Sequence, residues 1–199
     1  MSVRQRLVWI ATLAGKAAGL FVLGSMLLVL VLRWVPLPGS SYMVQTAISA
    51  WWSGQGPLRY EWTPYARIAP AAALAVIAGE DQRFPEHHGF DFVEIQDALE
   101  DQDEGKPMRG ASTLSQQVAK NLFLWPGRSL LRKALEAWFT VLLELFWSKQ
   151  RILEVYLNIA EFGERTFGVG AASLRFFAKP AARLSNEEAA RLAGVPVVR

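Results

Sequence analysis

The stretch Glu80-Asp81-Gln82-Arg83-Phe84-Pro85-Glu86-His87-His88-Gly89-Phe90-Asp91 concentrates four carboxylates, an arginine and both histidines of the chain. It directly follows residues 71–79, a run almost without polar side chains. Burying an unpaired carboxylate is costly, so a fold gains little stability from this placement. A carboxylate with one dry side and one open side is, however, what acid–base chemistry needs. The plain alternative is a helix end followed by a polar loop, and the residue types leave both interpretations open.

Composition indicates one domain together with a membrane-associated segment. Hydrophobic residues make up 52% of the 199 residues and charged residues 20%, with a mean hydropathy of +0.17. The net charge of +3 suits anionic lipid head groups or a phosphate-bearing substrate. Basic residues are not interleaved with aromatics in a tract, so no nucleic-acid partner is expected. The absence of cysteine excludes disulfides, cysteine-ligated zinc and a thiol nucleophile.

The N-terminal region predicts a single transmembrane anchor over residues 13–35, after a cytoplasmic segment 1–12. Lys16 and Arg33 flank its apolar core and can snorkel to the head groups, which extends the segment to the roughly 20 residues that cross a bilayer. No small-x-small cleavage site follows, so an uncleaved anchor is favoured over a signal peptide. Arg4, Arg6 and Lys16 place the N-terminus in the cytoplasm and the body outside it.

Residues 36–65 are predicted to form a juxtamembrane linker. They begin with Pro36, Pro38 and Gly39, which break the helix. One short helix in the linker is expected to lie on the bilayer surface, or its aromatic residues pack on the domain. The globular body is assigned to residues 66–199. Helical spacing is widespread in it and no long segment alternates with period two, so the body is predicted to be all-α.

Residues 110–121 suggest a polar helix start. Thr113 and Gln116 fit a capping box, which by itself needs no functional explanation. Gln116 and Lys120 are four residues apart and would share one face of the helix, as would Gln117 and Asn121. Hydrogen-bond donors gathered at the start of a helix suit a sugar or a phosphate. Arg109 adds a cation just before it. We therefore expect a binding function for the polar residues here, which are Ser112, Thr113, Gln116, Gln117, Lys120 and Asn121.

Two further polar groups have plain interpretations on residues alone. Lys133, Glu136, Thr140 and Glu144 would form a line along a helix at 130–147, with Arg132 four residues before Glu136. A solvated face with a surface ion pair, contributing a few tenths of a kcal/mol, explains that line. The segment 149–158 is predicted to be a packed helix whose polar residues make capping interactions.

Five blocks in the body together carry a resemblance. In order they resemble the peptidoglycan glycosyltransferases, the polymerising domain of bifunctional penicillin-binding proteins. A single anchor and no room for a transpeptidase domain make the chain similar to the monofunctional biosynthetic transglycosylases. The blocks are Glu80-Asp81-x-x-Phe84-x-x-His87-x-Gly89, Gly110-x-Ser112-Thr113-x-x-Gln116-Gln117-x-x-Lys120-Asn121, Arg132-Lys133-x-x-Glu136, Ile152-Leu153-Glu154-x-Tyr156-Leu157-Asn158, and Gly168 with Ala171-Ala172 and Lys179.

The resemblance implies a lysozyme-like fold and a specific reaction. Lipid II would be polymerised into β-1,4-linked glycan strands, with release of undecaprenyl diphosphate, at the bacterial inner membrane during cell-wall biogenesis. The family's base corresponds to Glu80 and its second carboxylate to Glu136. Cations for the diphosphate would come from Arg109, Lys120, Arg132 and Lys133. A divalent cation such as Mg²⁺, weakly associated with Asp81, is a further expectation, and no organic cofactor is expected.

Other interpretations accompany this one. A lysozyme-like lytic enzyme would use Glu80 as an acid, and a non-catalytic scaffold would bind other cell-wall synthesis and division proteins. The last block departs from the family pattern at Phe176-Phe177-Ala178-Lys179. The family also continues beyond the helix expected near 185–192, so the C-terminus is predicted to be shortened.

Overall fold

A computed structural model describes residues 2–103, 112–127 and 129–194. The described residues fall into two compact units, which divide between Val35 and Pro36. The first unit contains the helix α1, Val3–Leu32, which is long and apolar enough to cross a membrane. It begins well before residue 13, because Ser2 and Gln5 cap its start with reciprocal hydrogen bonds of 2.8 and 3.3 Å.

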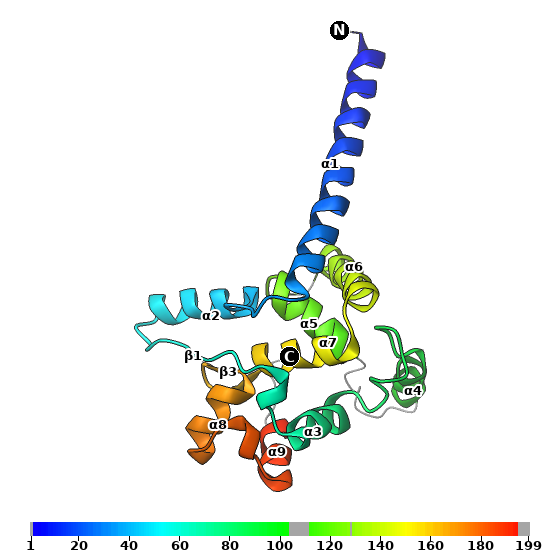
Figure 1. Cartoon of the computed structure of the whole chain (residues 1–199). Coiled ribbons are helices and arrows are strands. Elements are labelled where there is room, and N and C mark those ends of the chain that lie inside the picture. Colours follow the sequence, from blue (N-terminus) through cyan, green and yellow to red (C-terminus); the bar gives the residue numbers. More distant parts are fainter. Residues whose placement is uncertain (1, 104–111, 128, 195–199) are drawn as a thin grey trace. The chain divides into compact units, whose positions relative to one another are not determined.

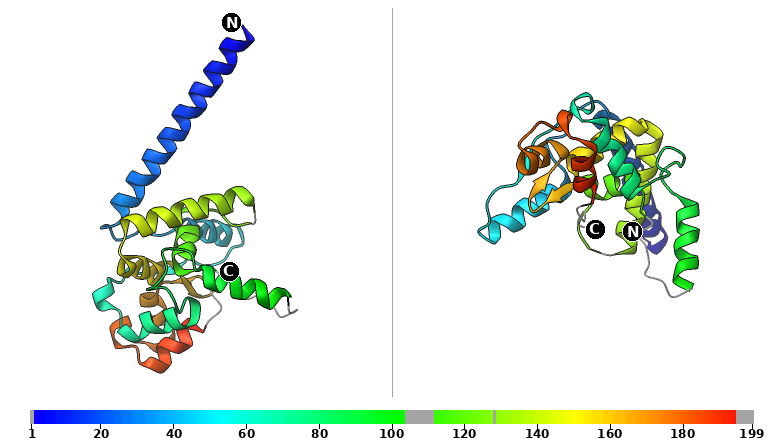
Figure 2. Two further views of the ribbon diagram at one scale, coloured as in Figure 1. Left: turned by 90° about the vertical axis from the view of Figure 1, so that its right-hand side faces the viewer. Right: turned by 90° about the horizontal axis from the view of Figure 1, so that it is seen from below.

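The second unit is built mainly from helices, as predicted (Figures 1 and 2). Its central helix is α5, Leu114–Phe123, which packs against α6 and α7 and also contacts α2. The helix α3, Pro70–Glu80, packs instead against α9, and Pro70 occupies its first turn, where proline is favoured. The remaining helices are α2 (Ser41–Trp52), η1 (Tyr65–Arg67), α4 (Phe92–Asp103), α6 (Leu130–Phe146), α7 (Lys149–Ile159), α8 (Val169–Phe177), η2 (Ala181–Arg183) and α9 (Asn186–Ala193).

The local signals for helix ends correspond to observed caps. Thr113 caps α5 with the complete capping box that the sequence predicts, and Ser185 caps α9 with a second complete capping box. The helix α4 was not predicted, although its signal was present. Asp91 accepts hydrogen bonds from the backbone amides of Val93 and Glu94 at 3.0 and 3.1 Å, which is an N-cap.

A small three-stranded sheet was also not anticipated. Its strands are β1 (Arg59–Tyr60), β2 (Glu161–Gly163) and β3 (Thr166–Phe167), in the order β1-β3-β2. β1 runs parallel to β3 and β2 antiparallel to it. Strands of two or three residues are too short to produce a detectable period-two pattern, which explains the omission.

The polar residues of α7 hold the linker on the body. Asn158 is fully buried. Its Oδ1 accepts from the Thr63 amide at 2.7 Å, and its Nδ2 donates to the Thr63 carbonyl at 2.9 Å. Glu154 Oε1 accepts from the Tyr65 amide at 2.8 Å. The segment is therefore a packed helix, as the plain interpretation expected, but Glu154 and Asn158 bond the backbone of the linker instead of capping the helix.

Candidate active site

The site begins where α3 ends beside the start of α5. Glu80 is the last residue of α3. Its Oε2 accepts a 2.9 Å hydrogen bond from Nε2 of Gln117, in the first turns of α5. Because Gln117 is buried, its amide holds the Glu80 carboxylate in one orientation, while Glu80 itself remains half exposed.

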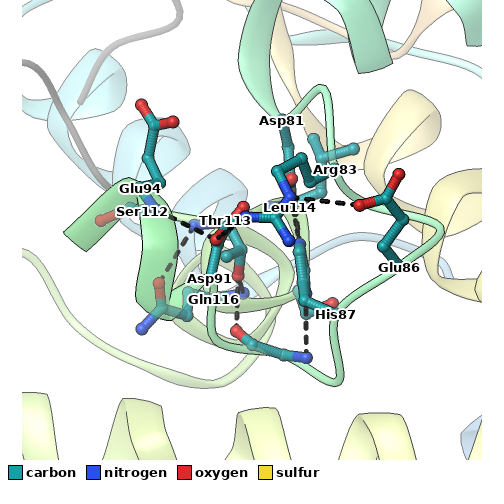
Figure 3. A network of polar contacts seen from close by, with 12 residues as sticks. Asp81, Arg83, Glu86, His87, Asp91, Glu94, Ser112, Thr113, Leu114 and Gln116 are labelled. Carbon is teal, nitrogen blue, oxygen red and sulfur yellow. Dashed lines mark hydrogen bonds and ion pairs between the residues drawn. The ribbon is translucent and has the colours of Figure 1, made fainter. Parts of the chain in front are cut away.

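A buried network fixes this junction (Figure 3). Nε2 of His87 lies 2.9 and 3.0 Å from the two carboxylate oxygens of Asp81. The backbone amide of Leu114, at the start of α5, donates to Asp81 Oδ2 at 2.8 Å. The Gly89 amide donates to Nδ1 of His87 at 3.1 Å, so the proton of the neutral ring is on Nε2. Asp81 therefore ties the end of α3 to the beginning of α5.

The helix α6 brings a second carboxylate and two cations. Glu136 is 3% exposed, and its oxygens pair with Arg132 at 2.8 Å and Lys133 at 2.5 Å. The sequence interpretation placed Glu136 and Thr140 on a solvent-exposed face of this helix. That interpretation is wrong for both residues, because both are buried and α6 packs against α5. Nε of Arg132 is buried and has no hydrogen-bond partner among the described residues.

These elements surround one cavity of about 490 Å³. It joins a carboxylate and amide sector, a cationic sector around Glu136, and an aromatic and apolar sector. The volume falls in the range of small-molecule sites. The described residues that line it are Tyr42, Glu80, Ser112, Gln116, Gln117, Lys120, Asn121, Leu124, Trp125, Pro126, Gly127, Arg132, Lys133 and Glu136.

The cavity brings together nine of the residues that the sequence proposed for the site. Thr113 does not line it; its hydroxyl instead donates to the Gly89 carbonyl at 2.7 Å and caps α5. Asp81 does not line the cavity either; it is buried in its hydrogen-bond network with His87 and Leu114. Arg109 lies outside the described residues. The catalytic and binding roles themselves stay predictions.

Sequence reasoning missed the aromatic and apolar sector. Tyr42 comes from α2, in the segment interpreted as a linker. Leu124, Trp125, Pro126 and Gly127 follow α5 directly. Proximity to the polar helix could have drawn attention to Trp125, but nothing in the local sequence places Tyr42 near residues about 80 positions away.

The described residues of the site do not by themselves form a binding site for a divalent cation. Among the described residues, no group of three or more histidine, cysteine, aspartate or glutamate side chains is placed to hold a metal. A cation at Asp81 would have to displace hydrogen bonds from His87 or Leu114. Mg²⁺ often binds through one or two carboxylates together with substrate phosphates, so most of its ligands would have to come from a bound diphosphate.

A helical body with two carboxylates and three cations in one cavity matches the class that the sequence predicted, a lysozyme-like glycosyltransferase. The sequence model of the family described as Transglycosylase matches residues 46–198, and the chain belongs to this family.

Three curated relatives carry the name biosynthetic peptidoglycan transglycosylase. The relative from Pseudomonas entomophila (strain L48) is 56% identical over 88% of this chain and 75% of its own length. The relative from Pseudomonas putida (strain W619) is 57% identical over the same shares. The relative from Pseudomonas syringae pv. tomato (strain ATCC BAA-871 / DC3000) is 54% identical over 90% and 77%.

Proposed function

We propose that this chain is a peptidoglycan glycosyltransferase that polymerises lipid II into β-1,4-linked glycan strands in bacterial cell-wall synthesis. The observation that supports this most is the shared cavity of Glu80, Lys120, Arg132 and Lys133. Its substrates are lipid II and the nascent strand. Membership of the transglycosylase family and the names of the relatives support the same activity.

Glu80 acts as the base in this mechanism. It takes the proton from the acceptor's 4-hydroxyl as that oxygen bonds to the anomeric carbon of the donor. The bond from this carbon to the diphosphate oxygen breaks, and the electron pair leaves with undecaprenyl diphosphate. Attack from the opposite face converts the α-linked donor into a β-linked product. Gln117 keeps the base oriented throughout, through its hydrogen bond to Oε2.

The cations stabilise the negative charge of the leaving group. Arg132 and Lys133 hold diphosphate oxygens, with Lys120 beside them. Because both carboxylate oxygens of Glu136 already pair with cations, its role is to position Arg132 and Lys133. A divalent cation bound to the diphosphate would add positive charge at the same place.

The location in the cell is part of the same proposal. α1 anchors the chain in the bacterial inner membrane. The basic residues Arg4, Arg6 and Lys16 keep its N-terminus in the cytoplasm, and the body lies on the periplasmic side. An anchored enzyme shares a surface with its polyprenyl substrate. The proposal also includes binding to other cell-wall synthesis and division proteins.

The test is polymerisation of labelled lipid II by the detergent-solubilised chain. We expect long glycan products from the wild type and loss of product with Glu80→Gln, while the circular dichroism spectrum and thermal midpoint stay unchanged. Polymerisation by Glu80→Gln at the wild-type rate would contradict the assignment of the base.

Two other outcomes distinguish the alternatives. Release of soluble muropeptides from purified sacculi would indicate a lytic enzyme. Binding of lipid II without turnover by the wild type would indicate a scaffold.

A further inference from the structure

Tyr42 contributes to the cavity from outside the matched domain. It stands in the first turn of α2 and lines the same cavity as Glu80 and Lys120. The family match begins at residue 46. One wall of the cavity is therefore supplied by the segment that precedes the family domain.

The beginning of α2 is attached to the end of α5, beside which it lies (Figure 1). The Ser41 hydroxyl bonds the carbonyl oxygen of Asn121 at 3.1 Å and also contacts that of Leu124. Nε2 of Gln45 donates to the Leu124 carbonyl at 3.1 Å. These side chains flank Tyr42 in the sequence, and the residues they hold lie next to the cavity. Tyr42 is thus placed by packed elements.

The Tyr42 side chain is itself held at two points. Its hydroxyl donates to Glu161 Oε2 at 3.3 Å, and its ring meets the Phe167 ring edge-on at a centroid distance of 5.9 Å. Burial raises the pKa of Tyr42, and the Glu161 carboxylate raises it further, so the hydroxyl stays protonated and acts as a donor. The rest of the half-buried ring is left for the cavity.

The chemistry of its neighbours suggests what this wall receives. The cations of the cavity suit a diphosphate, and the same lining also contains Tyr42 and the uncharged amides of Gln116 and Asn121. An aromatic ring can pack against the C–H face of a pyranose while amides bond its hydroxyls, a combination of apolar wall and few polar groups that is common in ligand sites. An oriented aromatic ring loses little conformational freedom when it binds.

We propose that Tyr42 is a substrate-binding residue whose ring holds a sugar unit of the lipid-linked substrate in the cavity. The inference rests on the proposed function and extends it to the segment ahead of the family domain. It follows that the juxtamembrane helix takes part in substrate recognition as well as in linking the anchor to the body.

The experiment measures kcat and KM for lipid II with the full chain in detergent. We expect Tyr42→Ala to raise KM by about tenfold with kcat within about twofold of wild type, because binding is lost and the reacting groups are untouched. Tyr42→Phe keeps the ring but loses the bond to Glu161, and should raise KM by about threefold. The matched control is Val44→Ala, an exposed position on the same helix, which should leave both constants unchanged.

A KM within about twofold of wild type for Tyr42→Ala in a folded chain overturns the inference. If Tyr42→Ala does not fold, Tyr42→Leu decides, because it removes the ring but keeps an apolar side chain, and an unchanged KM there overturns the inference as well. A second substrate with a shortened prenyl chain distinguishes sugar from lipid. We expect the same ratio of mutant to wild-type KM for both substrates, and a ratio that falls to one with the short chain contradicts the sugar assignment. A wild-type chain that does not polymerise lipid II contradicts the proposed function itself, and this inference with it.

Discussion

Nε2 of Gln117 donates a 2.9 Å hydrogen bond to Oε2 of Glu80, which joins the start of α5 to the end of α3. The proposed base therefore owes its orientation to a residue 37 positions further along the chain. The neighbouring hydrogen bond from the Leu114 amide to Asp81 also holds the end of α3 against the start of α5. The pair links two motifs that are separate in the sequence.

Replacing Gln117 with alanine should lower kcat by about tenfold to a hundredfold, because a loosely held base loses part of the advantage of positioned proton transfer. Lipid II polymerisation at saturating substrate measures this effect. Gln96→Ala is the matched control, since Gln96 is exposed on α4 and does not line the cavity. Wild-type kcat in a folded Gln117→Ala variant would show that the hydrogen bond does not orient the base.

Glu136→Gln should reduce the free energy of unfolding by about 2–4 kcal/mol, because it leaves the nearly buried Arg132 without its counter-charge. Urea denaturation in detergent measures the change. Glu187→Gln is the control: Glu187 pairs with Arg191 on the surface, where both side chains are mostly exposed, and its loss should change stability by less than about 1 kcal/mol. Equal effects at both positions would contradict a buried positioning role for Glu136.

Gly168→Ala should destabilise the body by about 2–4 kcal/mol. Gly168 has φ 82°, and a Cβ there would lie 2.7 Å from the backbone oxygen of Asn158, so neither the conformation nor the space suits alanine. Gly79→Ala gives the opposite expectation. A Cβ at Gly79 meets no atom within 4 Å, and replacing a helical glycine should add about 0.5–1 kcal/mol. Thermal unfolding of the two variants checks the difference in sign.

Glu188 predicts a pH-dependent contribution to stability. The hydrogen bond from Lys179, followed by that from the Ser185 backbone, lowers the pKa of Glu188 from 4.5 to about 2. A carboxyl group whose pKa is lower in the folded state stabilises the fold above its unfolded pKa and loses this contribution as the pH falls. Glu188→Gln should therefore be less stable than wild type at pH 6, and the gap should narrow between pH 4.5 and 2. Urea midpoints of both proteins across this range measure the gap; a constant gap would contradict the assignment.

Addition of Mg²⁺ after treatment with a chelator should raise the polymerisation rate without changing the thermal midpoint. The reason is that the cation would bind mainly through the substrate diphosphate, and the described residues contain no three-ligand group that a metal would stabilise. A midpoint that rises with Mg²⁺ in the absence of lipid II would instead indicate a site within the protein.

The sequence was a good guide wherever the deciding interactions are local. Caps at Thr113 and Ser185 depend on residues three positions apart, and the amphipathic pattern of 130–146 needs only helical geometry. It also identified most of the cavity, because the polar face of α5 is continuous in the sequence. It did not reveal the short sheet, since two-residue strands are stabilised by partners distant in the chain.

By itself, the sequence determined a helical body behind an apolar N-terminal segment, and the five blocks of the transglycosylase family in their order. Helix propensity, capping and hydrophobic periodicity act over a few residues, which is why they can be read directly. The tertiary structure alone decided that Glu136 is buried between two cations and that Asp81 clamps α5 through its backbone. It also decided that Tyr42 lines the cavity. These three facts depend on which faces of separate helices meet, and that is settled by packing across the whole body rather than by neighbours in the chain.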